Sequence, residues 1–510
     1  MASTKVLPAA QNVVGNIQMG NPKQKKPKAE LPRGFQDLSG RRLELRSKLL
    51  ETIGAIYHRH GFEALETPII ERLESLGKHL PDVDRPQGGV FAWRDDDEDW
   101  VALRYDLTAP LARYVAENRQ FLPRPFRRFQ TGPVFRNEKP GPGRFRQFTQ
   151  FDVDSVGTAS IQADAELCLI LARCLKAIGF ADDEFVVRVN DRRLLDALLD
   201  LVGLEDEAQR GDAMRAMDKF DRLGEEGVRA LLGPGRKDES GDETPGLGLD
   251  GVHIDRVLAF LLAGMGQDVD QLLSELGQLL DGHGVGLEAL EDLKLLAGLA
   301  KADSEVGHLI RIDPSVVRGL GYYTGMVFEA ELTFPVRNAK GEEVVFGSVA
   351  GGGRYDGLVA RFGGEAMPAT GMSIGIDRLV SAIMSRQDDE QDVFDGPVVV
   401  VNFGGREDGS AMALADMLRH AGVRAESYVG DAGLKAQMKY ADRRRARFVV
   451  LEGEDERAQN MVTLKDLAAG SQLAQDISSR AEWLAGQPAQ REVPRDKLAE
   501  LLFDLQGRQK

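Results

Sequence analysis

The chain has 510 residues and a formal net charge of -16 at pH 7, with 42% hydrophobic and 29% charged residues. A chain of this length exceeds what one hydrophobic core holds and predicts about two to four domains. The composition is typical of a globular protein, and no apolar run approaches the roughly 18 residues that a membrane-spanning helix needs. The N-terminal segment has no apolar stretch of the kind found in secretory signals, so we expect a cytoplasmic protein.

Residues 1–30 form a lead-in that carries a lysine cluster and no long apolar run. A nucleic-acid-binding arm is one interpretation of this lead-in, and we favour a disordered, solvated segment. The two cysteines, Cys168 and Cys174, lie in a helical pattern at a spacing that turns them to different faces. Neither a disulfide bond nor a zinc site is therefore expected, and the seven histidines show no metal-ligand spacing.

Apolar residues at helical spacing predict a helix over residues 41–60. Strand patterns follow it, beginning with "FEALETPII" and continuing with "WVALRYDL", "FRRFQTGPVFR", "RFRQFTQFDVDSV" and "EFVVRVN". These strands follow one another too closely for the crossovers that parallel strands need. We therefore predict an α+β fold, an antiparallel sheet with helices packed on it.

Residues 191–311 have a helical pattern, which the Gly- and acid-rich "LLGPGRKDESGDETPGLGLDG" interrupts as a flexible loop. Strand patterns then return, and a break at "SRQDDEQDVFDGP" precedes alternating strands and helices that are typical of a small α/β domain. We predict a lead-in, a first part of a core, a helical insertion, a second part of the core and an α/β domain, at residues 1–30, 31–190, 191–311, 312–390 and 395–510.

The segment "FRRFQTGPVFRNEKPGPGRFRQFTQFDVD", residues 126–154, predicts a hairpin around a Pro-Gly turn. Seven lysines and arginines lie between Phe121 and Phe148 against one acid, Glu138. A solvated, charged hairpin is one interpretation of this pattern. The position of Arg136 favours another, because it follows an apolar run in a strand predicted to be central, where an unpaired guanidinium is costly. Such a cation needs a carboxylate or a phosphate beside it.

Asp152 and Asp154 end the hairpin and alternate with apolar residues, so their side chains share one face of a strand. They either neutralise the arginines or bind a cationic ligand. The charges together fit a polyanion and an ammonium or imidazole group bound side by side.

The glycine-rich "SVAGGGRYDGLVARFGG", residues 348–364, matches neither a dinucleotide-binding motif nor a phosphate-binding loop. It is either a turn between strand and helix or a place where a ligand lies against the sheet. Arg378 lies in the first turn of a predicted helix, where the helix dipole disfavours a cation and a bound phosphate would favour it. Tyr322 and Tyr323 are paired tyrosines, which are more often core residues than ligand-binding ones.

These segments resemble a known family. "TGPVFRNEKPGPGRFRQF" resembles motif 2 of class II aminoacyl-tRNA synthetases, and "GMSIGIDRL" resembles their motif 3. "RGLGYYTGMVFE" and "AGGGRYDGLV" resemble the two segments peculiar to histidyl-tRNA synthetases, where the family more often has aspartate in place of Gly321. "LPRGFQDL" and "LRYDLTAPLARY" resemble the family's N-terminal part, and the segment from "QMKYADRRRARFVVLEG" onward resembles its anticodon-binding domain.

The resemblance implies roles for individual residues. Arg136 and Arg318 would be catalytic, acting on the charge at the ATP α-phosphate. The residues implied to bind ATP are Arg136, Glu138, Arg144, Phe148 and Arg378. The residues implied to bind histidine are Asp106, Leu107, Thr108, Arg136, Gln150, Asp154, Arg318, Tyr322 and Tyr323.

The implied reaction is the activation of histidine by ATP with Mg²⁺, without zinc, followed by transfer of histidine to tRNA(His). A homodimer is the assembly that the family implies. A second interpretation is a catalytically silent relative, the regulatory subunit of ATP phosphoribosyltransferase. Such proteins lack the anticodon-binding domain and lose parts of the motifs. This sequence has a segment that resembles that domain and keeps the arginines of motifs 2 and 3.

Overall fold

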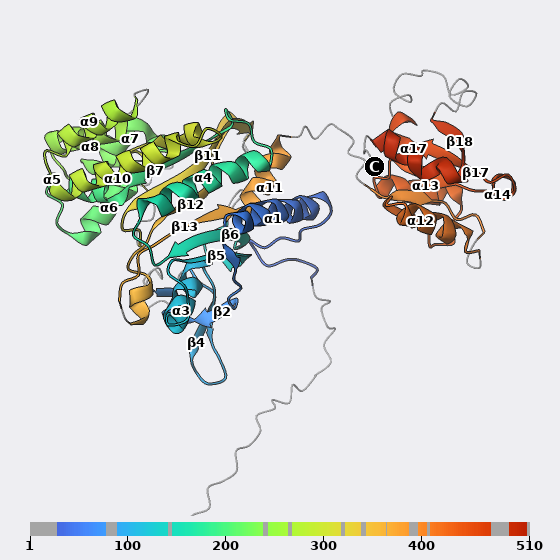
Figure 1. The fold of residues 1–510 in the computed structure, drawn as a ribbon, viewed down its shortest axis with the longest axis horizontal. Coiled ribbons are helices and arrows are strands. Elements are labelled where there is room, and N and C mark those ends of the chain that lie inside the picture. Colours follow the sequence, from blue (N-terminus) through green and yellow to red (C-terminus); the bar gives the residue numbers. More distant parts are fainter. Residues whose placement is uncertain are drawn as a thin grey trace, which may run out of the picture. The chain divides into compact units, whose positions relative to one another are not determined.

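The computed structural model describes residues 28–77, 89–140, 145–237, 243–263, 268–317, 322–337, 343–363, 365–386, 396–404, 408–470 and 489–506. The predicted lead-in therefore lies almost wholly outside the described residues. The chain divides into two compact units (Figure 1), of which the first contains residues up to Leu38 and Arg46–Leu379 and the second contains Ser39–Leu45 and Val380–Lys510. No helix within the described ranges is long and apolar enough to cross a membrane.

An eight-stranded sheet forms the centre of the first unit. Its inner strands pair antiparallel, as predicted, whereas the two edge strands β1 and β10 pair parallel with their neighbours. Because both edge strands are very short, the antiparallel pairs dominate the sheet. The strands in spatial order are β1 (Glu63–Ala64), β5 (Phe126–Phe135), β6 (Gln147–Val156), β13 (Ala369–Gly375), β12 (Glu343–Arg354), β11 (Met326–Arg337), β7 (Phe185–Asp191) and β10 (Ile310–Ile312).

Helices α1 (Arg41–Arg59) and α4 (Ile161–Ala177) supply apolar faces to one side of the sheet. Tyr57 of α1 packs edge-on against Phe151 of β6, with ring centroids 5.0 Å apart, and also contacts Phe129 of β5. Side chains alternate across a strand, so the even-numbered residues of β5 and β6 face the other side. That other side carries the polar side chains of the hairpin.

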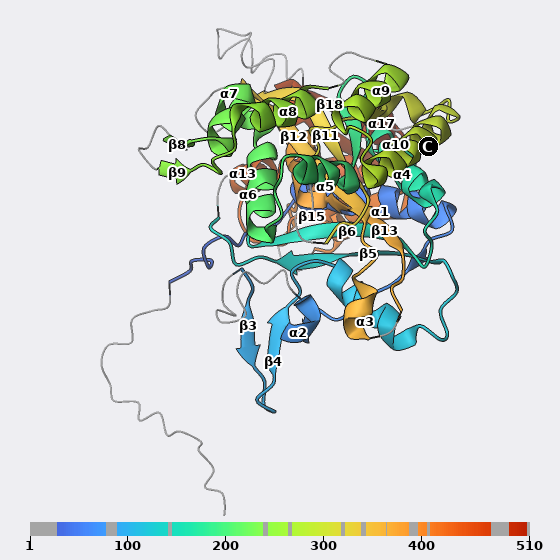
Figure 2. The same cartoon turned by 90° about the vertical axis from the view of Figure 1, so that its left-hand side faces the viewer.

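A separate three-stranded sheet contains β2 (Ile70–Arg72), β4 (Trp100–Leu103) and β3 (Ala92–Arg94). The prediction that "WVALRYDL" joins the main sheet is therefore wrong. The chain turns at the end of β4 into α3 (Thr108–Asn118), which packs beside the 3₁₀ helix η3 (Val359–Phe362) in one apolar cluster. Figure 2 shows β3, β4 and α3 below the main sheet. The short helix α2 (Leu73–Leu76) follows β2.

The predicted helical insertion follows β7 and returns the chain to β10. Its "GPGRKDESGDETPG" stretch is not a plain loop, because β8 (Gly235–Lys237) and β9 (Glu243–Pro245) pair antiparallel on either side of residues 238–242, which lie outside the described residues. The insertion's helices are α5 (Arg192–Leu201), α6 (Glu207–Met217), α7 (Phe220–Leu232), α8 (Gly251–Leu262), α9 (Val269–Leu279) and α10 (Gly284–Lys301), followed by η2 (Gly307–Leu309). Helix α11 (Ile376–Ser385) follows β13.

The second unit has a five-stranded mixed sheet in the order β15 (Ala425–Ser427), β14 (Val398–Val400), β16 (Phe448–Leu451), β17 (Met461–Asp466) and β18 (Gln490–Pro494). Its helices are α12 (Ser410–His420), α13 (Leu434–Arg443), α14 (Glu454–Ala458), η4 (Arg495–Lys497) and α17 (Leu498–Gln506). Helices α12 and α17 share one apolar cluster with the sheet, and α13 shares another, so both faces are covered. The mixed sheet with helices on both faces confirms the predicted C-terminal α/β domain.

Candidate active site

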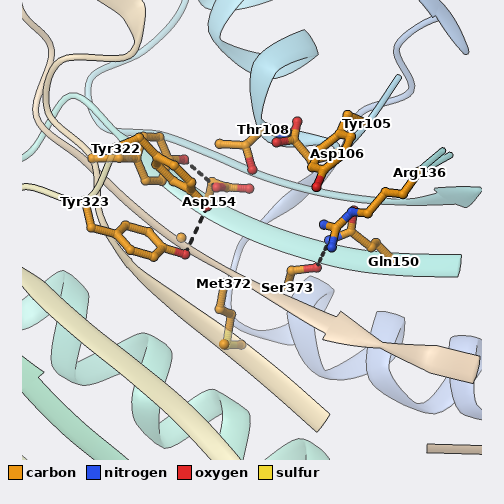
Figure 3. Close-up of a pocket in the computed structure, with 13 residues that line it drawn as sticks. Tyr105, Asp106, Thr108, Arg136, Gln150, Asp154, Tyr322, Tyr323, Met372 and Ser373 are labelled. Carbon is orange, nitrogen blue, oxygen red and sulfur yellow. Dashed lines mark hydrogen bonds between the residues drawn. The ribbon is translucent and has the colours of Figure 1, made fainter. Parts of the chain in front are cut away.

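Two adjoining pockets lie on the face of the main sheet opposite α1, and Figure 3 shows the residues that line one of them. They share part of their lining, in particular Arg136, Gln150, Ser373 and the tyrosine pair. We call the one that reaches Asp154 the inner pocket and the one that reaches Arg378 the outer pocket. The inner pocket is lined by Tyr105, Asp106, Thr108, Arg136, Gln150, Asp154, Tyr322, Tyr323, Gly351, Tyr355, Gly371, Met372 and Ser373.

The floor of the inner pocket is a buried ion pair. The sheet register places Arg128 of β5 opposite Asp154 of β6, and their Nη2 and Oδ2 atoms are 2.8 Å apart. Tyr355 also donates its hydroxyl proton to the Asp154 carboxylate. Burial raises the pKa of Asp154, while Arg128 and the Tyr355 hydrogen bond oppose that rise. The Asp154 carboxylate is therefore held at the base of the inner pocket by Arg128 and Tyr355.

Gly371 of β13 is the third residue at this level of the sheet. It lies opposite Asp154 in the register, and a Cβ atom there would overlap the Asp154 carboxylate. Glycine is thus required at this position by the side chain across the strand. Gly352 of β12 is required for a similar reason, since its Cβ would overlap the Gly371 carbonyl, whereas Gly351 itself lines both pockets.

Asp106 forms a side wall of the inner pocket at the start of α3. Its Oδ1 accepts hydrogen bonds from the backbone N–H groups of Thr108, at 3.2 Å, and Ala109, at 2.9 Å. These bonds satisfy donors that a helix start leaves unpaired. Leu107 is not among the residues that line either pocket; its side chain is fully buried, and its carbonyl accepts from Arg128 Nη2 at 3.1 Å.

Arg136 lies at the junction of the two pockets, just beyond the end of β5. Its guanidinium carbon is 4.5 Å from the Tyr105 ring centroid and 5.0 Å from that of Phe148. Aromatic faces attract a cation without using its N–H donors. The buried Nε of Arg136 has no hydrogen-bond partner among the described residues. We predicted a carboxylate or phosphate at this arginine, and its neighbours leave it able to bind one from a ligand.

The outer pocket continues from Arg136 toward α11 and is lined by Glu138, Phe148, Asp377 and Arg378, among others. Glu138 accepts from the Tyr105 hydroxyl at 3.0 Å, which fixes one of the two rings beside Arg136. The Arg378 guanidinium lies 5.5 Å from the centroid of Phe346 of β12. Positive charge thus lies at both ends of this pocket.

The paired tyrosines form the far wall of both pockets. The Tyr322 hydroxyl donates to the Tyr323 hydroxyl at 3.1 Å, and their ring centroids are 4.4 Å apart. Burial raises the pKa of Tyr322 well above its usual value, so it stays a neutral hydrogen-bonding group. Both tyrosines line the inner pocket together with Asp154 (Figure 3).

Most of the residues singled out in the sequence lie together here. Arg318 and Arg144 lie outside the described residues. Of the other arginines in the hairpin, Arg127 faces away from the pockets and pairs with Glu166 of α4 at 2.8 Å. The sequence reasoning assigned no role to several residues that line or support the inner pocket, among them Tyr105, Arg128, Tyr355, Met372 and Ser373. Tyr105, Tyr355, Met372 and Ser373 lie within the family segments of the sequence, so their position in those segments was the available signal.

A class II aminoacyl-tRNA synthetase must bring an amino acid and the phosphates of ATP together on one antiparallel sheet. The first unit has a largely antiparallel sheet with two adjoining pockets on one face and Arg136 where they meet. Residues 34–379 match the family model described as "Histidyl-tRNA synthetase", and residues 397–487 match the model "Anticodon binding domain". The chain belongs to the histidyl-tRNA synthetase family.

Individual relatives agree with this assignment. The chain is 50% identical over 498 residues to the histidine–tRNA ligase of Dinoroseobacter shibae, covering 96% of this chain and 99% of that one. The crystal structure of histidyl-tRNA synthetase from Nostoc superposes with a TM-score of 0.70 at 28% identity, covering 94% of this chain and all of that one. A Bacillus halodurans structure, described as an ATP phosphoribosyltransferase regulatory subunit/histidyl-tRNA synthetase, has a TM-score of 0.62 at 23% identity over 82% of this chain and 97% of that one, which shows the fold alone.

Proposed function

We propose that the chain is a histidine–tRNA ligase that uses the inner pocket for histidine and the outer pocket for ATP. In the first step the histidine carboxylate attacks the α-phosphate of ATP and pyrophosphate leaves, which gives histidyl-adenylate. In the second step the terminal ribose hydroxyl of tRNA(His) takes the histidyl group. Neither step needs a nucleophile from the protein.

The histidine side chain and ammonium group are recognised by the inner pocket. Asp154 and Tyr323, with Tyr322 beside them, bind the imidazole at the end where the Arg128 pair holds the carboxylate in place. The ammonium group lies nearer the junction, where three polar side chains of the lining converge, those of Asp106, Thr108 and Gln150. Acceptors at one end and a cation at the other orient the amino acid with its carboxylate toward Arg136.

ATP occupies the outer pocket with its α-phosphate at Arg136. Phe148 stacks on the adenine, Glu138 contacts the base region and Arg378 binds the terminal phosphates. Arg144 and Arg318, assigned to terminal phosphates and the α-phosphate by their motifs, complete the set. Catalysis comes from positioning and from the stabilisation of charge that grows on the α-phosphate. Mg²⁺ enters with ATP as part of the substrate, and zinc is not required.

The single observation that carries the proposal is the position of Arg136. Its guanidinium lies against two aromatic rings, those of Tyr105 and Phe148, at the point where the two pockets join. Held in this way, it can bind the histidine carboxylate and the α-phosphate at the same time.

The C-terminal unit binds the tRNA anticodon region, and we propose that the enzyme acts in the cytoplasm as a homodimer.

Histidine-dependent exchange between ATP and pyrophosphate tests the proposal. We expect exchange with histidine and none with other amino acids, together with charging of tRNA(His). A well-folded preparation that binds histidine but catalyses no exchange would instead favour the regulatory-subunit interpretation.

A further inference from the structure

A fully buried carboxylate without a role in the proposed mechanism lies beside the inner pocket. Asp152 is on β6 between Gln150 and Asp154, on the same face of the strand, and only 2% of its surface is exposed. In the sheet register it lies opposite Ser373 of β13. Its Oδ1 atom has no hydrogen-bond partner among the described residues. A carboxylate is costly to bury unless it is paired or hydrogen-bonded, so the neighbours of Asp152 need to be accounted for.

A chain of hydrogen bonds connects Asp152 with the pocket. Ser373 lies opposite Asp152 across the two strands, and its hydroxyl lowers the pKa of the Asp152 carboxyl as a hydrogen-bond donor. Gln150 Nε2 in turn donates to Ser373 Oγ at 2.6 Å, a bond that Figure 3 shows. An ionised carboxylate only accepts hydrogen bonds, so the Ser373 proton is directed to Asp152. The lone pairs of Ser373 are then left to accept from the Gln150 amide. The charge on Asp152 therefore sets the direction of the whole chain.

This direction fixes which atom of the Gln150 amide faces the pocket. Because Nε2 is bound to Ser373, Oε1 is the atom left for a ligand, and this buried oxygen has no partner among the described residues. A carbonyl oxygen accepts from an ammonium group. The reversed amide would instead present N–H donors to that ammonium, which repels it.

We propose that Asp152 is a positioning residue for amino-acid binding, which acts through Ser373 to hold the Gln150 carbonyl oxygen toward the α-ammonium group of histidine. This inference rests on the proposed function, because that function places the ammonium group at Gln150. Asp152 contacts neither histidine nor ATP in this proposal. It determines which atom of the Gln150 amide faces the ammonium group.

The electrostatics of the site make this role dependent on pH. Burial raises the pKa of Asp152 to about 8, an effect that Asp154 and Asp106 increase and Arg128 opposes. Above this pKa the carboxylate accepts the Ser373 proton, and below it Asp152 carries a proton that it can donate to Ser373. The charged or titratable groups that interact with Asp152 from the surrounding elements are Arg128, Asp154, Asp106, Arg104, Tyr57, Tyr322 and Tyr355.

The test compares Asp152→Asn and Ser373→Ala with the unchanged enzyme in pyrophosphate exchange. At about pH 8.5, where Asp152 is mostly ionised, we expect each substitution to raise KM for histidine about tenfold, the effect of one hydrogen bond to a charged group. KM for ATP should stay unchanged. The double variant should be no worse than either single one, because both break the same chain.

At about pH 6.5 Asp152 is protonated in the unchanged enzyme, so the KM ratio of Asp152→Asn to that enzyme should fall toward one. Taking this ratio cancels the titration of histidine itself. Ser155→Ala is the matched control, since its buried hydroxyl lies on the opposite face of β6 and has no partner among the described residues. We expect it to leave KM for histidine unchanged at both pH values.

An unchanged KM for histidine in folded Asp152→Asn and Ser373→Ala overturns the inference, and so does a ratio that is the same at both pH values. Ser373→Ala alone decides the first point if Asp152→Asn does not fold. Gln150→Ala separates this inference from the proposed function. If Gln150→Ala raises KM for histidine and the other two variants do not, only the role of Asp152 is wrong. If Gln150→Ala also has no effect, the assignment of the ammonium group is wrong.

Discussion

The Arg128 guanidinium and the Asp154 carboxylate form an ion pair across two neighbouring strands with almost no contact with solvent. Their side chains are 0% and 3% exposed, and Nη2 and Oδ2 are 2.8 Å apart. Arg128 lies below the pocket and Asp154 forms part of its surface. Under the proposed function, the pair links the stability of the sheet with the recognition of histidine, because the same carboxylate takes part in both.

Arg128→Met should strongly destabilise the first unit. Removing one partner of a buried pair leaves the other charge uncompensated, which typically costs about 3 to 5 kcal/mol. Arg127→Met is the matched control, since it removes the adjacent arginine, whose pair with Glu166 is partly exposed, at 27% and 34% of the two side chains. We expect about 1 kcal/mol or less from that change. Urea unfolding of both variants measures the difference, and equal losses would contradict the structural weight given to Arg128.

Asp154→Ala should raise KM for histidine and should also destabilise the first unit, because it leaves the buried Arg128 guanidinium without its carboxylate. Loss of a buried hydrogen-bonded partner costs on the order of 2 to 5 kcal/mol of binding, so KM for histidine should rise steeply while KM for ATP changes little. Asp164→Asn serves as the control, because it alters another buried aspartate, whose partner Arg354 lies at the end of β12. That control should lower stability without a change in KM for histidine. A folded Asp154→Ala enzyme with its histidine KM intact would contradict the assignment.

Arg136→Ala should nearly abolish adenylate formation with the fold intact. Its charge acts where negative charge grows in the transition state, so kcat should fall more than ATP affinity, by ~10² to 10³. Arg136→Lys should recover little, because an ammonium group cannot make two parallel hydrogen bonds to the carboxylate and phosphate. Single-turnover measurement of adenylate checks both variants. Activity within a few-fold of the unchanged enzyme would make Arg136 structural.

Strand alternation was enough to predict which residues share a face. It gave Asp152 and Asp154 a common side of β6, and the same reasoning separates Arg127 from Arg128, whose side chains turn to opposite faces of β5. The α+β sheet and the C-terminal α/β domain were also predicted from such patterns. What alternation does not supply is register, and register is what pairs Arg128 with Asp154 and Asp152 with Ser373.

Contacts between distant segments were the other gap. Tyr105 comes from the end of β4, and only the folding of that strand into a separate sheet brings its ring over Arg136. The sequence suggested a charged partner for this arginine, because a buried guanidinium was expected to need one. Aromatic faces meet part of that need and leave the charge for a ligand. The motifs of the family identified the pocket residues, and the tertiary structure explains how they are supported.

The last prediction concerns the division of work between the core and the C-terminal domain. Every residue to which we assign histidine or ATP precedes Arg386, and none lies in the unit that matches the anticodon-binding model at residues 397–487. A chain ending near Asp395 should therefore still form histidyl-adenylate, provided that it folds. Charging of tRNA(His) should fall sharply, because the second binding surface and its phosphate contacts are lost.

Pyrophosphate exchange and tRNA charging should be measured on the same truncated preparation, after its oligomeric state and unfolding midpoint are compared with those of the full chain. Salt provides an internal control, because contacts with phosphates weaken as ionic strength rises. The full chain should lose charging with added salt faster than it loses exchange, and the truncated chain should show a shallower salt dependence of whatever charging remains. A well-folded truncated enzyme that loses both activities equally would show that the C-terminal domain supports the active site directly.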